Sequence, residues 1–233
     1  MPSSTALDLY AKVEDLLGVK EASPKLYAHY FLTLGSIEFD SLLDVGCGSG
    51  DFLYQVDKAF APQLLRGIDL SPQMIEQSKN YNLDTRVQDL CSVEESFQVI
   101  TAVFDMLNYL DKPSLQSFLV CIENSLTPQG YFLCDINTLF GFEEVAVGSL
   151  SIDDNERFLA IESDFDANIY SSDFTLFEKD GSCYKKSKES IKQYYHKVQE
   201  IIKLLPNMQL IAQDKVTLYL DEADKEFLVF RKI

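Results

Sequence analysis

The sequence is short of basic residues, of histidine and of long apolar stretches. Its 233 residues carry 20 Lys and Arg against 37 Asp and Glu, which gives a formal charge of −17. Because nucleic-acid binding relies on Lys and Arg to displace counterions, this balance disfavours a DNA- or RNA-binding role. No run of about 18 apolar residues is present, so we expect no membrane span. The two histidines, His29 and His196, lie far apart in the chain, which argues against a histidine-based metal site.

Cysteine pairs of the kind that bind zinc are missing as well. None of the five cysteines forms a C-x-x-C pair: Cys47, Cys91, Cys121, Cys134 and Cys183. Such an odd set favours reduced thiols in a cytoplasmic protein over a disulfide framework or a zinc site. Near the N-terminus, Asp8, Glu14 and Asp15 stand where a signal peptide would need basic residues and then an apolar block. We therefore expect a cytoplasmic protein without a bound metal.

What is present is the composition of a packed α/β protein. Hydrophobic residues make up 46% of the chain, and the length fits one domain with an insertion. Short apolar strands alternate with helices between residues 41 and 136, which indicates a parallel sheet with helices on both faces. Between residues 157 and 193, strands follow one another without helices. This change predicts an antiparallel β insertion after the fifth strand.

The boundaries of the expected elements follow from apolar periodicity and from capping residues. We expect helices at 5–17, from Ser23-Pro24 to Gly35, at 51–60, from Ser71 onward, at 113–126 and at 196–205. Strands are expected at 41–45, 64–69, 85–88, 99–104, 131–136, 157–162, 167–178, 182–193, 208–219 and 226–231, with a hairpin at Asp180-Gly181. The single domain, 1–233, would comprise N-terminal helices (1–36), a core (37–137), the antiparallel insertion (138–195) and a C-terminal helix with two strands (196–233).

A glycine-rich loop after the first strand is the strongest functional signal. Leu42–Gly50 reads LLDVGCGSG, in which a strand containing Asp44 leads through three glycines into a helix. Glycines allow positive φ and let backbone N–H groups approach a ligand closely. Asp69 ends the next strand, where a carboxylate can accept hydrogen bonds from ribose hydroxyls. Because Asp51 replaces the last glycine of the dinucleotide fingerprint, the loop favours a nucleoside ligand without phosphates and with an amine that Asp44 could meet.

These segments resemble the class I S-adenosylmethionine-dependent methyltransferases. Leu42–Gly50, Gly67–Met74 and Val87–Leu90 carry most of the resemblance, and Phe104–Leu110 and Leu126–Tyr131 extend it. It implies a Rossmann-like fold with a seven-stranded, mostly parallel sheet, and methyl transfer by in-line displacement to nitrogen or oxygen of a small molecule. The N-terminal helices resemble the lid of that family. The antiparallel insertion resembles that of sugar-amine and glycine-type N-methyltransferases and of uncharacterised bacterial relatives.

The resemblance also implies roles for single residues. The implied cofactor-binding residues are Tyr10, Asp44, Gly46, Cys47, Gly48, Gly50, Asp69, Leu70, Met74, Asp89, Leu90 and Phe104. Among them, Asp44 and the three glycines would surround the methionine part of the cofactor, Asp69 would hold the ribose, and Asp89 with Leu90 would contact the adenine. For Met74 and Phe104 a place in the hydrophobic core is an equally simple interpretation.

Candidate groups for the methyl acceptor cluster where the fourth and fifth strands end. They are Asp105, Asn108, Tyr109, Asp135 and Asn137. We assign Tyr109, Asn108 and Asn137 to the catalytic site, since a tyrosine recurs at the place of Tyr109 in related small-molecule enzymes. In the lid, Tyr10-Ala11-Lys12-Val13 is followed by Glu14, where the family usually has tyrosine.

Two other functions fit the same sequence. One is a different nucleoside-cofactor enzyme on this fold, such as an aminopropyl transferase or a nicotinamide-dependent oxidoreductase, although the glycine spacing disfavours the latter. The other is a non-catalytic partner subunit that still binds S-adenosylmethionine. As partners we expect a small-molecule methyl acceptor, with no nucleic acid and no membrane, in a monomer or a homodimer.

Overall fold

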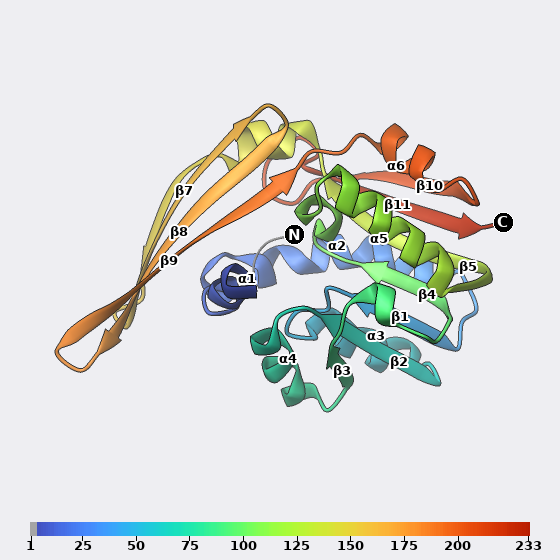
Figure 1. Ribbon diagram of the computed structural model, residues 1–233, viewed down its shortest axis with the longest axis horizontal. Coiled ribbons are helices and arrows are strands. Elements are labelled where there is room, and N and C mark those ends of the chain that lie inside the picture. The colour runs from blue at the N-terminus through green and yellow to red at the C-terminus, as the bar shows by residue number, and fades with distance from the viewer. Residues whose placement is uncertain (1–3) are drawn as a thin grey trace.

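The fold is built around a seven-stranded sheet, shown in the computed structural model of Figure 1, which describes residues 4–233. The strand order is β10-β11-β5-β4-β1-β2-β3. Strands β3, β2, β1, β4 and β5 run parallel, whereas β11 is antiparallel to both β5 and β10. The strands are β1 (Ser41–Val45), β2 (Leu64–Asp69), β3 (Asp84–Val87), β4 (Phe97–Ala102), β5 (Leu126–Asn137), β10 (Met208–Val216) and β11 (Lys225–Lys232). The predicted mostly parallel sheet is confirmed.

Helices cover both faces of this sheet, because each turns an apolar side toward it. The α-helices are α1 (Ser4–Ala11), α2 (Val19–Leu34), α3 (Asp51–Phe60), α4 (Pro72–Ser78), α5 (Lys112–Ser125) and α6 (Val198–Leu204). On one face, α5 and α6 contribute Phe118 and Ile201 to a buried core. On the other, α2 and α3 contribute Tyr30 and Phe52 to a second core. The sheet is therefore enclosed on both sides, and its strand ends remain for ligands.

The strand order reverses between β1 and β4, which are neighbours although β2 and β3 follow β1 in the chain. In open α/β sheets, ligands bind beyond the carboxyl ends of the strands at such a reversal. Asp44, close to the end of β1, is paired with Gly67 of β2 and Thr101 of β4. The fold thus brings the acid of the glycine-rich segment to the place where a ligand is expected.

A second sheet of four antiparallel strands follows β5 and extends from the core as a long ribbon beside α1 (Figure 1). Its strands are β6 (Gly148–Asp153), β7 (Arg157–Asp166), β8 (Ile169–Asp180) and β9 (Cys183–Tyr194). Leu159 and Phe174 of this sheet pack against Leu9 and Val13 of the N-terminal segment. The predicted antiparallel insertion is confirmed. Strand β6 was not predicted, because it is short and most of its residues are exposed.

The N-terminal helices differ from the prediction. Instead of one helix over 5–17, the chain forms α1 and then a separate one-turn helix, η1 (Glu14–Leu16). The predicted start at Ser23-Pro24 is wrong, because α2 begins directly after Gly18 and contains Pro24. Pro24 has no N–H to offer the Lys20 carbonyl, but the Ser23 hydroxyl donates a hydrogen bond to that carbonyl at 3.1 Å. The hydroxyl replaces the missing backbone bond, so the helix continues through the proline.

Two of the cysteines are joined, which corrects the expectation of unpaired thiols. Cys91 and Cys121 form a disulfide with their Cα atoms 5.1 Å apart. Cys91 lies in the one-turn helix η3 (Leu90–Ser92) and Cys121 in α5, and these two elements pack together. Their wide separation in sequence gives no spacing signal, so only the fold reveals the pair. Cys47 and Cys134 are free and buried, and Cys183 is free and exposed.

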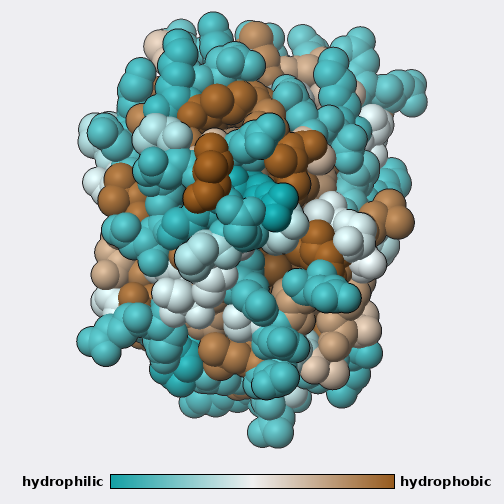
Figure 2. Space-filling view, turned by 90° about the vertical axis from the view of Figure 1, so that its right-hand side faces the viewer, coloured by the Kyte–Doolittle hydropathy of each residue, from teal (hydrophilic) through white to brown (hydrophobic). Residues whose placement is uncertain are grey.

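The surface next to the C-terminus is mainly hydrophilic. Figure 2 shows apolar side chains on that face in small groups separated by polar ones. A large continuous apolar patch of the kind that marks a protein interface is therefore not seen on this face. Among the residues that the structure describes, no helix has the length and apolar character needed to cross a membrane.

Candidate active site

The glycine-rich loop turns the chain sharply from β1 into α3. Gly46 and Gly48 have φ values of 74° and 53°, in the left-handed region that other residues rarely adopt. A Cβ atom on Gly46 would lie 2.8 Å from Cγ of Met106. Glycine is therefore required at position 46 both by the backbone conformation and by this close approach. The result is a wall of bare backbone at the strand ends.

A cavity of about 210 Å³ lies against this wall. All predicted cofactor-binding residues except Gly50 line it: Tyr10, Asp44, Gly46, Cys47, Gly48, Asp69, Leu70, Met74, Asp89, Leu90 and Phe104. Gly50 instead caps α3 and faces α4, since a Cβ atom there would lie 3.1 Å from Cβ of Ser78. The fold thus gathers residues from the ends of β1, β2, β3 and β4 around one space.

Asp44 is the buried acid of this cavity. Its side chain lies between neighbouring strands, and the Thr101 hydroxyl donates a hydrogen bond to Oδ1 at 2.7 Å. Burial, only partly opposed by that hydrogen bond, raises the pKa of Asp44 to about 7. A carboxyl group in this state favours a cation as its partner, because a positive charge stabilises the ionised form.

Asp69 is held in a fixed orientation at the end of β2. Its two carboxylate oxygens accept hydrogen bonds from the backbone N–H groups of Gly48 (3.0 Å) and Ser71 (2.8 Å). Burial raises the pKa of Asp69, and these backbone donors oppose the shift. Each carboxylate oxygen can accept a second hydrogen bond, so acceptor capacity remains on the side of the cavity.

The far end of the cavity, beyond β3, is bounded by apolar side chains and one acid. Asp89 accepts a hydrogen bond from the Cys91 N–H at 2.8 Å and so begins η3. Leu90 and Met74 are buried, whereas Leu70 is more exposed, and all three line the cavity. A flat aromatic ring can lie between such side chains while Asp89 accepts a hydrogen bond from its edge.

A second cavity, of about 430 Å³, adjoins the first. Tyr10 and Tyr109 line both cavities, and Gln193 lines the second. The rest of the second cavity is apolar or hydroxyl-bearing: Leu17, Val145, Ala146, Val147, Gly148, Ser149, Leu150, Ile161, Ser163, Tyr170, Ser172, Phe174 and Ile191. Among the described residues, no Asp, Glu, Lys, Arg or His lines it. This space suits an uncharged molecule with polar substituents.

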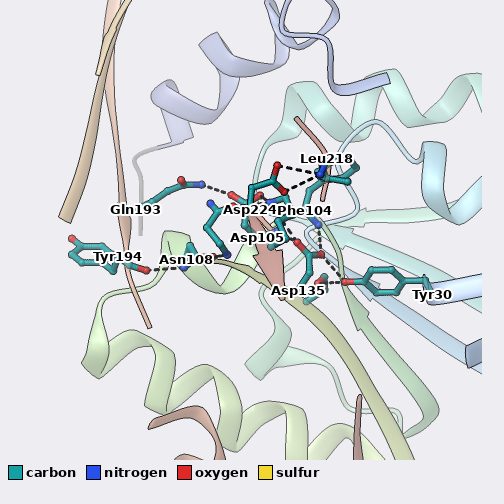
Figure 3. A network of polar contacts seen from close by, with 12 residues as sticks. Tyr30, Phe104, Asp105, Asn108, Asp135, Gln193, Tyr194, Leu218 and Asp224 are labelled. Atoms are coloured by element: carbon teal, nitrogen blue, oxygen red, sulfur yellow. Dashed lines mark hydrogen bonds and ion pairs between the residues drawn. The ribbon is translucent and has the colours of Figure 1, made fainter. Parts of the chain in front are cut away.

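A buried polar network lies behind the two cavities (Figure 3). Asp135 of β5 accepts hydrogen bonds from the N–H groups of Phe104 and Asp105, both at 2.8 Å, and from the Tyr30 hydroxyl at 2.7 Å. Phe104 and Asp105 both have positive φ, so this carboxylate holds a strained turn after β4. Lys225 of β11 pairs with Asp105 and lies 3.6 Å from Asp135. Sequence reasoning missed Tyr30 and Lys225, because each lies far from the motifs in the chain.

Of the three residues predicted as catalytic, one lines the cavities and two lie in the network behind them. Tyr109 lines both cavities, and burial raises its pKa, so its hydroxyl stays protonated. Asn108 donates to the Tyr194 carbonyl at 2.8 Å and accepts from the Asn137 N–H at 2.9 Å. The Asn137 side chain accepts from Lys225 at 2.8 Å. Both asparagines therefore join the turn after β4 to β9, β5 and β11, and they line neither cavity.

The N-terminal segment covers the cavities and is fastened on both sides. The Ser71 hydroxyl, at the start of α4, donates a hydrogen bond to Asp8 at 2.7 Å. At the other side, the Arg157 guanidinium of β7 donates to both carboxylate oxygens of Asp15, at 3.0 and 2.7 Å. Tyr10 lies between these attachments. Within residues 4–233, no group of three or more His, Cys, Asp or Glu side chains is placed to hold a metal ion.

Comparisons with known proteins agree with this architecture. Residues 42–130 match a family model described as a methyltransferase domain. A similar solved structure is an S-adenosylmethionine-dependent methyltransferase from Clostridium acetobutylicum, with 21% identity, a TM-score of 0.77 and coverage of 96% of this chain and 99% of that one. The CcbJ methyltransferase from Streptomyces caelestis has 15% identity, a TM-score of 0.75 and coverage of 99% of both chains. The sugar N-methyltransferase KedS8 from a Streptoalloteichus species has 15% identity, a TM-score of 0.66 and coverage of 97% of this chain and 87% of that one. No curated protein matches the chain.

The matched region contains the features on which the cavity depends. It runs from β1 to the first part of β5 and includes the glycine-rich loop, Asp69 and Asp89. The solved structures extend the similarity of fold to the N-terminal helices and the second sheet, since they cover nearly the whole chain. Residues 42–130 therefore match a methyltransferase domain, and the fold of the chain is similar to that of solved S-adenosylmethionine-dependent methyltransferases.

Proposed function

We propose that this chain transfers the methyl group of S-adenosylmethionine to an amine nitrogen of a small, uncharged acceptor. The observation that carries this proposal is the pair of adjoining cavities. One is lined by carboxylates, and the other has an uncharged lining rich in hydroxyl groups. Because Tyr10 and Tyr109 line both cavities, donor and acceptor would meet beside these two rings.

The charge of the first cavity supports a cationic nucleoside as the cofactor. Its lining contains several acids and a single basic residue: Glu14, Asp44, Asp51, Asp69, Asp89 and Lys20. S-adenosylmethionine carries a positive sulfonium, a positive ammonium and one carboxylate, so its net charge is complementary to this lining. A nicotinamide dinucleotide would bring a pyrophosphate, which these carboxylates would repel.

The placement of the residues supports an orientation for this cofactor. Asp69 would accept hydrogen bonds from the ribose hydroxyls, each worth about 1.5–3 kcal/mol because one partner is charged. Asp89 and Leu90 would contact the adenine, with Leu70 and Met74 packed on its faces. Asp44, the glycine loop and Phe104 would then surround the methionine part.

The protein contributes chiefly alignment and exclusion of water. When bound, S-adenosylmethionine supplies an electrophilic methyl group on its sulfonium. Holding the two reactants in line contributes roughly 7–11 kcal/mol to lowering the barrier. The N-terminal segment and the second sheet enclose the space where this alignment would occur. We assign direct contact with the acceptor to Tyr109, and the positioning of its turn to Asn108 and Asn137.

The absence of a basic group favours nitrogen over oxygen as the acceptor atom. An alcohol must lose its proton during methylation, and this requires a nearby general base. No carboxylate or imidazole lines the second cavity among the described residues, and burial raises the pKa of both Tyr10 and Tyr109. A neutral amine needs no base to attack. The tyrosine oxygens can accept its N–H bonds and so direct its lone pair.

Methylation assays on matched acceptors test the proposal. The purified chain is incubated with S-adenosylmethionine, at a pH above the pKa of the amine, and with pairs of small molecules that differ only in bearing an amino or a hydroxyl group, amino sugars and their hydroxy analogues included. Formation of S-adenosylhomocysteine is measured. We expect turnover with amines and at least 100-fold less with the matched alcohols, because no carboxylate or imidazole lines the second cavity among the described residues.

Two variants separate binding from chemistry in this assay. Asp69→Ala should abolish the thermal stabilisation by S-adenosylmethionine, since the ribose loses its acceptor. Tyr109→Phe should retain that stabilisation but lower turnover. Preferential methylation of alcohols would refute the assignment of nitrogen, and the absence of any stabilisation of the wild-type chain would refute the cofactor.

A further inference from the structure

The first cavity runs across the sheet from the end of β3 to the ends of β1 and β4. At its β1 and β4 side, α2 forms part of the wall through Lys20, Ser23 and Tyr27. The Tyr27 ring contacts the rings of Phe52 and Phe104, with centroids 5.0 and 5.8 Å apart. This side is therefore opposite to the adenine end at Asp89. It is the place where the amino acid part of the proposed cofactor would lie.

Glu14 and Lys20 bring opposite charges to this end of the cavity, and their side chains do not form an ion pair with each other. Both line the cavity, one from η1 and the other from the first turn of α2. Within the described part of the chain, neither side chain makes a hydrogen bond or an ion pair within 4 Å. The charges that most affect Glu14 are those of Lys20, Asp51 and Asp69, and all of these residues line the same cavity. Glu14 is half-buried and Lys20 is more exposed, and as cavity-lining groups of opposite charge they suit the two charged groups of a ligand.

We propose that Glu14 and Lys20 recognise the amino acid head group of the cofactor. The Glu14 carboxylate accepts hydrogen bonds from the α-ammonium, and the Lys20 ammonium pairs with the α-carboxylate. This assignment rests on the proposed function and adds to it two residues from outside the glycine loop. It gives a role to Glu14, the position at which the chain departs from the lid pattern of related sequences.

The roles of Glu14 and Asp44 are compatible. An ammonium group has three N–H donors, and one carboxylate cannot satisfy them all. Asp44 approaches from the sheet, where one of its oxygens already accepts from Thr101. Glu14 approaches from the N-terminal segment on the opposite side. The head group would therefore connect the covering segment to the sheet.

Three nucleosides test the two residues separately: two are sulfonium compounds that differ in the head group, and the third is an uncharged thioether without it. S-adenosylmethionine has both charges, its decarboxylated form lacks the carboxylate, and 5′-methylthioadenosine lacks the whole amino acid. Calorimetric titration of the complete chain gives a dissociation constant for each. Glu14→Gln should weaken the first two about tenfold and leave the third unchanged, since a charge-assisted hydrogen bond is worth roughly one such factor. Lys20→Met should weaken S-adenosylmethionine alone.

A nearby charge that does not line the cavity is the control. Glu21→Gln removes an exposed acid next to Lys20 and should change none of the three constants. The assignment is overturned if Glu14→Gln and Lys20→Met bind all three nucleosides as the wild type does. It is overturned equally if they weaken 5′-methylthioadenosine as much as S-adenosylmethionine. If the wild-type chain binds none of the three, the proposed function itself fails.

Discussion

Asp44 shows how one residue can combine a structural cost with a binding role. The carboxyl is buried in the sheet with a single hydrogen-bond donor, Thr101, and its pKa is raised to about 7. Without a ligand it is therefore protonated below neutral pH, which avoids a buried negative charge. A cation in the cavity stabilises the ionised form. Cofactor binding should then release a proton when the pH lies below about 7.

This coupling predicts that cofactor affinity rises with pH. If only ionised Asp44 binds the ammonium, affinity should increase about tenfold between pH 6 and pH 8, because roughly nine-tenths of the carboxyl is protonated one unit below its pKa. Calorimetric titration with S-adenosylhomocysteine, which keeps the ammonium, measures this. Asp44→Asn should lower affinity at pH 8 and remove most of the pH dependence. A profile in the variant as steep as in the wild type would assign the titration to another group.

The sequence predicted the residues of this cavity well and those of the network behind it poorly. Motif residues such as Asp44, Asp69 and Asp89 lie at strand ends, and the order of strands is enough to bring them together. Gly50 was placed at the cofactor by the family resemblance, whereas it packs against α4. Lys225 belongs to the last strand, and nothing near it in sequence indicates that it is buried beside two carboxylates.

At the level of elements, a buried ion pair joins β11 to the turn after β4. Lys225 contacts Asp105 and Asn137 and lies close to Asp135, and its side chain is 4% exposed. Nearby carboxylates raise the pKa of Lys225 against the effect of burial, so it stays charged. The antiparallel strand β11 thus fixes the turn that carries Tyr109.

Removal of this ammonium should destabilise the protein and impair the active site together. Lys225→Met leaves two carboxylates close to each other without a counter-charge, and loss of one member of a buried pair costs about 3–5 kcal/mol. Urea denaturation should show this loss, while Lys215→Met, on an exposed position of β10, should change stability by less than about 0.5 kcal/mol. If Lys225→Met were as stable as the control, the pair would have no structural role.

Elements with strong local signals were predicted to the residue, and those set by tertiary contacts were not. The helix at 51–60 and the strand at 64–69 match the structure, since glycine, apolar periodicity and turn residues delimit them. The start of α2 was missed because a serine–proline pair normally begins a helix, and here the Ser23 hydroxyl compensates for the proline instead. The π-helix η5 (Gly141–Ala146), which leads into β6 at the second cavity, has no sequence signal of its own.

Over the whole molecule, the N-terminal segment joins the second sheet to α4. It packs on the second sheet through Leu9 and Val13 and reaches α4 through Asp8. Two ion pairs also attach it to the second sheet: Lys12 pairs with Glu178 at 2.9 Å, and Arg157 pairs with Asp15. Because this segment lines both cavities through Tyr10, the strength of the attachments should influence binding and release of the acceptor.

Arg157 is the strongest of these attachments, and its removal should loosen the covering segment. The guanidinium contacts Asp15 through two hydrogen bonds, and it also bonds the Lys12 carbonyl at 2.7 Å and Asp154 at 2.8 Å. Arg157→Ala should increase amide hydrogen exchange in residues 4–17 and raise the KM for the acceptor several-fold, with a stability loss of about 1–2 kcal/mol.

Amide exchange and KM in Arg157→Lys should fall between those of the alanine variant and of the wild type, because lysine keeps the charge but not the planar pair of donors. Arg86→Ala removes an exposed pair with Asp84 on β3 and should leave exchange in residues 4–17 unchanged. Raising the salt concentration should increase amide exchange in residues 4–17 of the wild type, part of the way toward the exchange in Arg157→Ala, because partly exposed ion pairs are screened. Equal protection of residues 4–17 in Arg157→Ala and in the wild type would show instead that apolar packing on the second sheet alone holds the segment closed.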